Sequence, residues 1–130
     1  MTDIINIALV DDEVEVFNLF KMHFRKEIRS GLYNFFFFEN GEECYEFLER
    51  NKDEVEILLI LSDVNMPVMD GLTLLTLVHN NYGYVKVFMI TAYETEELVS
   101  KANELGATGF LSKPLDFNQL KKQIKEIGFV

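Results

Sequence analysis

Short apolar runs alternate along this chain with segments whose apolar residues recur at helical spacing. The runs that predict strands cover residues 4–10, 32–38, 55–61, 85–90 and 110–111. Helical spacing is found at Phe17 to Ile28, Cys44 to Leu48, Leu72 to Val78, Leu98 to Leu105 and Phe117 to Ile127. Strict alternation of strand and helix is typical of α/β proteins, in which helices cover both faces of a parallel sheet. The pattern therefore predicts five strand–helix units in one doubly wound, flavodoxin-like fold.

Local signals support this division of the chain. Asn40 followed by Glu43 resembles a capping box at the start of the second helix. Gly106 is placed to end the fourth helix, and Asp116 to begin the fifth. The four consecutive phenylalanines at 35–38 predict a strand that is buried on both faces.

Length and composition fit one domain, residues 1–130, with a substantial core, because 48% of the residues are hydrophobic. The formal net charge of −10 opposes binding of this domain to nucleic acid or to an anionic membrane surface. Cys44 is the only cysteine, which excludes an intrachain disulfide and a cluster of thiolate metal ligands.

The N-terminal residues lack the basic and long apolar segments of a signal peptide. The longest uncharged apolar run, residues 57–61, is far too short to span a bilayer. We therefore expect a cytoplasmic protein that does not enter a membrane.

Polar side chains follow each of the five predicted strands, with Glu39 and Asn40 after the second. Asp11 and Asp12 follow the first strand, Asp63 the third, Thr91 the fourth and Lys113 the fifth. In a doubly wound parallel sheet of order 2-1-3-4-5, binding sites form beyond the C-terminal ends of the strands. The second strand would lie at the edge of that sheet. The other four strand ends are expected to bring three carboxylates, one hydroxyl and one ammonium group together.

Three neighbouring carboxylates repel each other unless a cation or a proton lies between them. Oxygen ligands without His or Cys favour Mg²⁺ or Mn²⁺ over zinc. Mg²⁺ held by carboxylates is a usual setting for phosphate chemistry, and a carboxylate can itself become an aspartyl phosphate. Lys113 and Thr91 would then bind the phosphoryl oxygens.

Four segments together resemble the receiver domain of two-component response regulators. They are LVDDE at 9–13, LSDVNMPVMDG at 61–71, MITAY at 89–93 and GATGFLSKP at 106–114. Each segment alone is a weak signal, but all four occur in the right order at the ends of predicted strands. The resemblance covers essentially the whole chain.

The resemblance implies that Asp63 is the phosphoacceptor. It also implies a metal site formed by Asp63, by Asp12 as a direct ligand, by Asp11 through water, and by the backbone carbonyl of Asn65. The remaining implied roles are phosphoryl binding by Lys113, switching by Thr91 and Phe110, an open phosphoryl site beside the small Ala92, and a cis peptide bond before Pro114.

The implied function is a phosphorylation-activated signalling module that assists its own phosphorylation and dephosphorylation, rather than an enzyme. The implied donor is a histidine kinase or a histidine phosphotransfer protein. Phosphorylation is implied to switch the face formed by the fourth helix, the fifth strand and the last helix. That face would contact a downstream protein or an output domain outside this chain, and homodimerisation through it stays open.

Two other functions use similar chemistry. A haloacid-dehalogenase-like phosphomonoesterase would use Asp63 as nucleophile, but such enzymes place a second acid where this chain has Asn65, and their nucleophile follows the first strand. A flavin carrier would bind the FMN phosphate after the first strand, where the acidic sequence VDDE would repel it.

Several features have simpler interpretations or depart from the family pattern. Asp70-Gly71 predicts only a turn and a helix start, without a chemical role. The chain between the acid pair and Asp63 is a few residues longer than usual in the family, with the extra length expected near residues 25–33 or 51–54.

Overall fold

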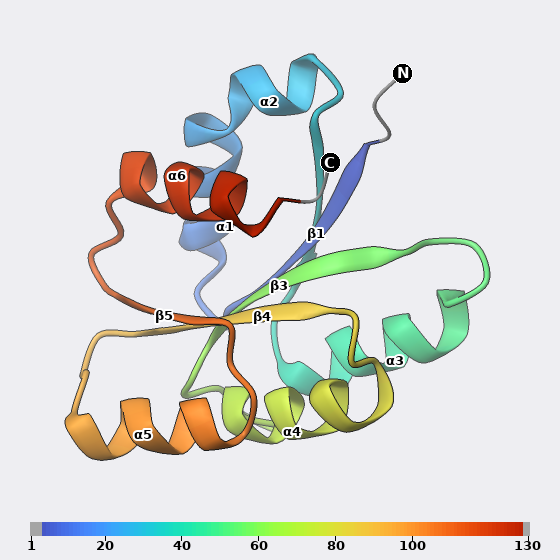
Figure 1. Cartoon of the computed structure of the whole chain (residues 1–130). Helices are drawn as coiled ribbons and strands as arrows, with labels where there is room; N and C mark the ends of the chain where they lie inside the picture. The colour runs from blue at the N-terminus through green and yellow to red at the C-terminus, as the bar shows by residue number, and fades with distance from the viewer. Residues whose placement is uncertain (1–3, 129–130) are drawn as a thin grey trace.

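The computed structural model describes residues 4–128 and contains a five-stranded parallel sheet (Figure 1). In sheet order the strands are β2 (Tyr33–Phe38), β1 (Ile5–Val10), β3 (Ile57–Asp63), β4 (Lys86–Thr91) and β5 (Gly109–Ser112). The predicted fold class and the strand order 2-1-3-4-5 are confirmed. Because all four strand pairs are parallel, the C-terminal ends of all five strands point the same way and line one end of the sheet.

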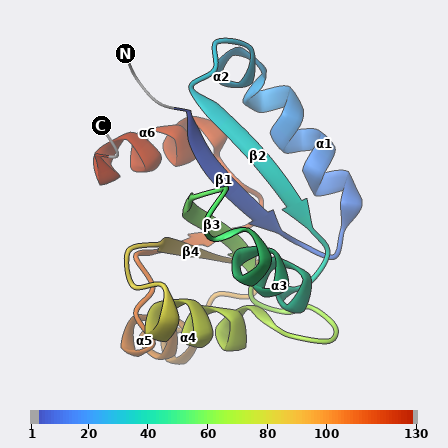
Figure 2. The same cartoon turned by 90° about the vertical axis from the view of Figure 1, so that its right-hand side faces the viewer.

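Helices cover both faces of the sheet (Figures 1 and 2). One layer contains α1 (Val14–His23), α2 (Arg25–Arg29) and α6 (Phe117–Ile127), and the other contains α3 (Gly41–Asn51), α4 (Gly71–Asn81) and α5 (Glu96–Glu104). Alternate side chains of each strand point to opposite faces, so each layer covers its own apolar core. No helix within residues 4–128 is long and apolar enough to cross a membrane.

The single helix predicted between the first two strands is wrong, because the chain bends at Phe24. With φ of −102° and ψ of 16°, Phe24 separates α1 from α2. The rings of Phe20 and Phe24 are both fully buried and stack with their centroids 5.8 Å apart. The bend keeps both rings in the core while the chain turns towards β2. The additional helix, α2, lies in one of the two segments where extra chain length was expected.

The sequence predicts burial on both faces for Phe35–Phe38, and the structure bears this out in part: the strand packs on both faces, but its side chains are only half-buried. β2 is an edge strand that pairs with β1 alone. Phe35 and Phe37 pack against the core beneath α1, and Phe36 and Phe38 pack against the core on the opposite face. Because no strand of the described part of the chain lies beyond β2, each of these four side chains is only half-buried.

The predicted starts of two helices are confirmed by their side-chain caps. Asn40 Oδ1 accepts a hydrogen bond from the N–H of Glu43 at 2.9 Å, and Asp116 Oδ1 accepts one from the N–H of Gln119 at 3.1 Å. These caps satisfy backbone donors that have no partner within the helix itself.

Cys44 of α3 has no exposed surface, and burial raises the pKa of its thiol to about 12. The thiolate is the reactive form of cysteine. We therefore expect iodoacetamide at mildly alkaline pH to leave Cys44 unmodified in the folded protein and to alkylate it fully in urea, as read by intact mass. Rapid alkylation without denaturant would contradict this burial.

Candidate functional site

The predicted site residues lie at the C-terminal ends of β1, β3, β4 and β5. Asp11 and Asp12 follow β1, and Asp63 is the last residue of β3. Thr91 ends β4, and Lys113 follows β5. The backbone N–H of Lys113 donates to the carbonyl of Thr91 at 2.8 Å, which fixes the end of β5 beside β4.

Lys113 links two of the carboxylates directly. Its Nζ lies 3.1 Å from Oδ2 of Asp11 and 3.2 Å from Oδ2 of Asp63. Only 3% of Asp11 and 8% of Asp63 is exposed, so both ion pairs are largely shielded from solvent. The second oxygen of Asp11, Oδ1, accepts a hydrogen bond from the N–H of Glu13 at 2.9 Å, which holds this carboxylate in place.

The surroundings of the site shift two of its pKa values. Burial raises the pKa of Asp63; the ammonium group of Lys113 opposes this shift, and the charge of Asp11 adds to it. Burial by itself would lower the pKa of Lys113, but its hydrogen bonds and charge interactions with Asp11 and Asp63 outweigh burial and raise it. Lys113 is therefore a firmly held cation, whereas the ionised form of Asp63 is destabilised.

Asp11, Asp12 and Asp63 form an acidic triad that is suited to a metal ion. Each can offer one carboxylate oxygen, and these three atoms lie within 4.8 Å of one another. Asp12 is exposed, so the triad is open to solvent on one side. The group contains only hard oxygen donors, which favour Mg²⁺ or a similar cation over zinc.

The main chain of Asp63 is held as firmly as its side chain. Its carbonyl accepts a hydrogen bond at 2.9 Å from the buried hydroxyl of Ser62. The next residue, Val64, donates its N–H to the carbonyl of Ile90 at 3.0 Å, so the strand pairing with β4 continues past the acid. The phosphoacceptor candidate therefore stands on a rigid part of the sheet.

Gly71 has a role at the site that was not predicted from the sequence. Asp70 caps α4 by accepting from the N–H of Thr73 at 2.8 Å, as a turn and helix start require. Gly71, however, packs directly against Asp63: a Cβ atom built on it would lie 2.1 Å from the carbonyl oxygen of Asp63 and 2.7 Å from Cε of Met89. Only a residue without a side chain allows α4 to begin this close to the site.

The loop between Asp63 and α4 contains Asn65, whose side chain is exposed. The N–H of Gly71 donates to the carbonyl of Val64 at 2.8 Å and closes this loop. Val68, at its tip, has φ of 68°, a conformation that β-branched residues rarely adopt.

The loop between β4 and α5 contains Thr91 and Ala92. Thr91 is buried, and its Oγ1 accepts a hydrogen bond from the N–H of Tyr93 at 3.2 Å; no hydrogen bond joins it to a carboxylate within residues 4–128. Ala92 is exposed. A further contact, for which the sequence contains no evident signal, is the hydrogen bond from the hydroxyl of Ser112 to the carboxylate of Glu94 at 2.5 Å. It joins this loop to the end of β5.

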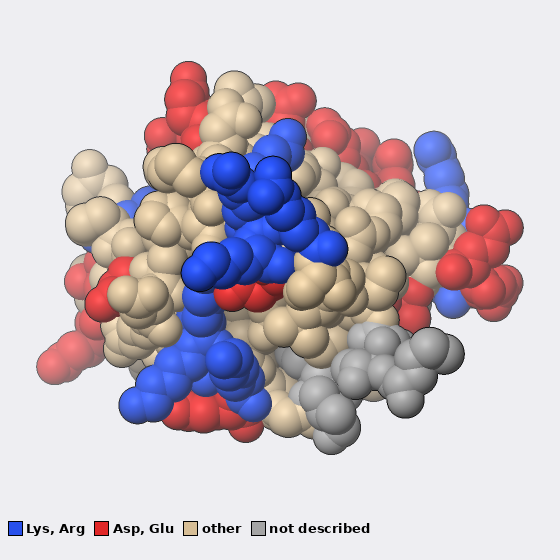
Figure 3. Space-filling model, turned by 90° about the horizontal axis from the view of Figure 1, so that it is seen from above, with Lys and Arg blue, Asp and Glu red and all other residues tan. Residues whose placement is uncertain are grey.

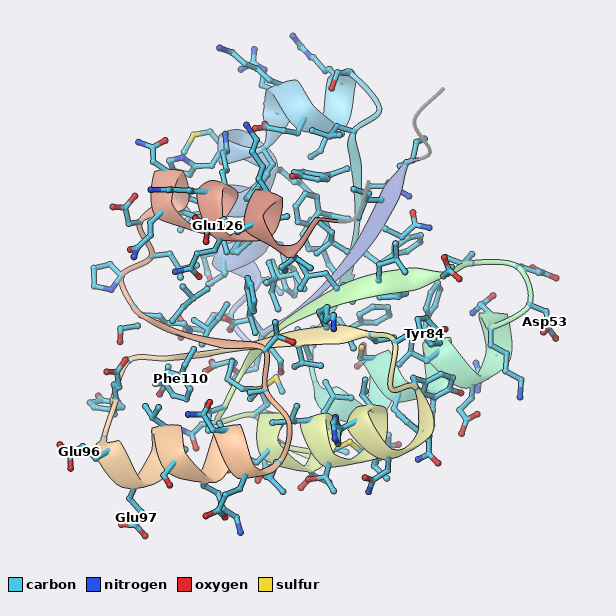
Figure 4. The ribbon with its side chains drawn as sticks, viewed as in Figure 1. Asp53, Tyr84, Glu96, Glu97, Phe110 and Glu126 are labelled. Carbon is cyan, nitrogen blue, oxygen red and sulfur yellow. The ribbon has the colours of Figure 1, made fainter. Side chains whose placement is uncertain are left out.

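Two more predicted residues belong to β5 and the turn after it. Phe110 is partly buried and packs against the core that α3, α4 and α5 cover, on the side of the sheet where α5 lies (Figure 4). The peptide bond between Lys113 and Pro114 is cis.

Comparisons with known proteins agree with this geometry. The family model for the response regulator receiver domain matches residues 7–125. The chain is 28% identical over 120 residues to sporulation initiation phosphotransferase F of Bacillus subtilis (strain 168), which covers 92% of this chain and 90% of that protein. It is 31% identical over 88 residues to the transcriptional regulatory protein LnrK of the same strain, covering 68% of this chain and only 38% of LnrK.

A solved structure shows the same fold. The CheX–CheY–BeF₃–Mg²⁺ complex from Borrelia burgdorferi contains a chain that superposes with a TM-score of 0.83 at 29% sequence identity. The superposition covers 97% of this chain and 90% of that one.

Proposed function

This chain belongs to the response regulator receiver domain family, and we propose from this premise that Asp63 is its phosphoacceptor. A receiver domain is a phosphoacceptor in phosphorylation-activated signalling rather than a classical enzyme. The observation that carries the proposal is the ammonium group of Lys113, which lies between the carboxylates of Asp11 and Asp63. From this position it can contact both the acceptor and an incoming phosphoryl group.

In the proposed reaction, a carboxylate oxygen of Asp63 attacks the phosphorus of a phosphohistidine donor. The new P–O bond forms as the P–N bond breaks, and the electron pair of that bond returns to the imidazole ring of the donor. Lys113 donates a hydrogen bond to a phosphoryl oxygen and balances part of its charge.

Asp63, Asp12 as a direct ligand and Asp11 through water would hold Mg²⁺, or Mn²⁺ in its place, with the backbone carbonyl of Asn65 as a further ligand. The convergence of three hard carboxylate oxygens supports this assignment. Such an ion would neutralise negative charge on the oxygens of the transferring phosphoryl group.

Phosphorylation would reach the surface through Thr91 and Phe110. The Thr91 hydroxyl would exchange its hydrogen bond with the N–H of Tyr93 for one with the phosphoryl group, beside the small Ala92. Phe110 would turn inward with it and alter the face formed by α5, β5 and α6. The position of Thr91 at the end of β4, held by a single side-chain hydrogen bond among residues 4–128, supports this proposal.

Receiver domains work with kinase or phosphotransfer partners. We assign a histidine kinase or a histidine phosphotransfer protein as the phosphoryl donor and the cytoplasm as the location. Residues 1–130 form the proposed receiver domain, of which residues 4–128 are described. The chain spans 38% of LnrK but 90% of phosphotransferase F, so the output is either a separate protein or another domain of a longer chain. A homodimer formed through the face of α5, β5 and α6 is compatible with both arrangements.

Intact-protein mass after incubation with acetyl phosphate tests the assignment. With Mg²⁺ we expect a labile gain of one phosphoryl group, and with EDTA no gain. If acetyl phosphate does not react, the same measurement with a phosphorylated histidine phosphotransfer protein should give the gain. Failure with both donors would contradict the proposal, and steady hydrolysis of a phosphomonoester would favour a phosphatase instead.

We expect Mg²⁺ to raise the melting temperature of the protein, because a cation relieves the repulsion within the acidic triad and binds only the folded state. At one hundred times its Kd, such a ligand stabilises by about 2.7 kcal/mol. Calorimetry in Mg²⁺ and in EDTA measures the gain. Asp12→Asn should reduce it, whereas Asp53→Asn, which changes an exposed acid far from the site (Figure 4), should not. An undiminished gain in Asp12→Asn would contradict the proposed ligand set.

A further inference from the structure

One face of this acidic protein is basic. The helices α1, α2 and α6 contain seven of the twelve Lys and Arg residues but only three of the twenty-two Asp and Glu residues. Their net charge is therefore +4, and the rest of the chain carries −14. Figure 3 shows blue side chains gathered over α2 and α6. We define the α2–α6 face by Arg25, Lys26, Arg29, Lys121, Lys122 and Lys125.

The two helices of the α2–α6 face are joined to each other. The Nζ of Lys121 in α6 forms an ion pair with Glu27 of α2 at 3.0 Å. The same Nζ lies 5.2 Å from the ring centroid of Phe24, which is fully buried. Cations from two separate parts of the sequence therefore form one continuous surface.

The other five cations of this face are exposed and form no salt bridge within residues 4–128. This is notable in a chain with 22 acidic residues, because acids are available to pair with them. Their charge is left for a partner that comes from outside the domain.

The α2–α6 face is separate from the phosphoacceptor site. α2 lies just before β2, at the N-terminal ends of the strands, where the N–H of Ile5 donates to the carbonyl of Leu32 at 3.0 Å. Asp63 lies at the C-terminal ends of the strands, on the opposite side of the sheet. Figure 1 shows α2 at the top of the molecule, away from the ends of β4 and β5. A partner on α2 would therefore leave the acidic triad accessible.

We propose that the α2–α6 face binds an acidic, partly apolar segment of a partner protein. Charge complementarity requires an anion, and the exposed side chains of Met22 and Ile28, which are 59% and 36% accessible, add apolar surface from α1 and α2. Arg and Met are both enriched at protein interfaces. The strong charge asymmetry of the domain would orient it towards such a partner during the encounter.

Other anionic partners fit this face less well. A nucleic acid or a membrane surface extends beyond the patch and would meet the remainder of the chain, which carries −14. A second copy of the chain, binding with its acidic side, would form a heterologous contact, which builds a ring or an open filament of many copies rather than a simple pair. A short acidic segment covers the basic face alone and avoids this repulsion.

Fluorescence anisotropy with a short labelled peptide of Glu and Leu residues tests the proposal. The wild type is compared with Arg25→Glu/Lys26→Glu/Arg29→Glu and with the control Arg50→Glu/Lys52→Glu, which reverses exposed charges on the opposite layer. We expect the peptide to bind the wild type and the control alike, and the triple variant at least about tenfold more weakly. Added salt should weaken the binding.

Acetyl phosphate should modify the triple variant as it modifies the wild type, which shows that the variant is folded and the site intact. Equal peptide affinity of the triple variant and the wild type would overturn the proposal. So would tighter binding of a single-stranded oligonucleotide or of phosphatidylserine vesicles than of the peptide. Concentration-dependent self-association that disappears in the triple variant would assign the face to a second copy instead.

Discussion

We expect Asp63→Asn to take up no phosphoryl group from acetyl phosphate, and yet to be more stable than the wild type in EDTA. An amide oxygen is a far weaker nucleophile than a carboxylate and cannot form the aspartyl phosphate. The stability follows from the charge, because Asn removes one of three carboxylates within 4.8 Å of each other. Lys113 keeps its ion pair with Asp11 at 3.1 Å.

The sign of the stability effect depends on the pKa of Asp63, which burial raises above its ordinary value of 3.8. When the pKa of a carboxyl group is higher in the folded state than in the unfolded state, ionisation of that group destabilises the folded protein. The loss of stability develops as pH rises from the unfolded-state pKa through the folded-state pKa. The gain in the free energy of unfolding from Asp63→Asn should therefore be larger at neutral pH than at an acidic pH near the ordinary aspartate pKa of 3.8. Urea denaturation in EDTA at both pH values measures it.

Asp70→Asn is the matched control for Asp63→Asn, because it makes the same chemical change a few residues away. Asp70 caps α4, and Asn is about as good an N-cap as Asp, so this variant should fold and be phosphorylated normally. If Asp63→Asn still gained a labile phosphoryl group, or if it unfolded at lower urea than the wild type at neutral pH, the assigned role and charge balance would be wrong.

The acidic triad could be predicted from the sequence because a parallel sheet places the ends of its strands along one edge. Asp11, Asp12, Asp63 and Lys113 each lie at or within two residues of a strand end, so small errors in strand boundaries did not separate them. The prediction used the strand order 2-1-3-4-5 of flavodoxin-like sheets, which the alternation of strand and helix is compatible with but does not determine by itself.

Features that depend on packing could not be predicted in this way. Helical spacing runs unbroken through Phe24, and only the burial of two stacked rings shows why the helix bends there. The run of phenylalanines has the same composition at the edge of a sheet as at its centre, so its half-burial follows from topology rather than from local sequence. The α2–α6 face likewise exists only because two helices distant in sequence lie side by side.

Gly71 shows this limit most clearly, and we expect Gly71→Ala to be strongly destabilising. Intrinsic helix propensity predicts the opposite sign, since Ala is favoured over Gly by about 1 kcal/mol within a helix. The new Cβ, however, would lie 2.1 Å from the carbonyl oxygen of Asp63, and that oxygen belongs to a buried strand which cannot move alone. We expect a loss of about 3 kcal/mol in the free energy of unfolding, at the upper end of the usual cost of overpacking.

Two other glycines provide a graded comparison for Gly71→Ala. A Cβ on Gly41, the first residue of α3, would lie 3.0 Å from the carbonyl oxygen of Met69, and one on Gly83 would meet nothing closer than 3.7 Å. Urea denaturation should therefore rank the losses as Gly71→Ala first, Gly41→Ala second and Gly83→Ala last. Because the first substitution also pushes on the main chain of Asp63, its folded fraction should be phosphorylated more slowly than that of the other two. A Gly71→Ala protein as stable and as reactive as Gly83→Ala would show that α4 does not begin against Asp63.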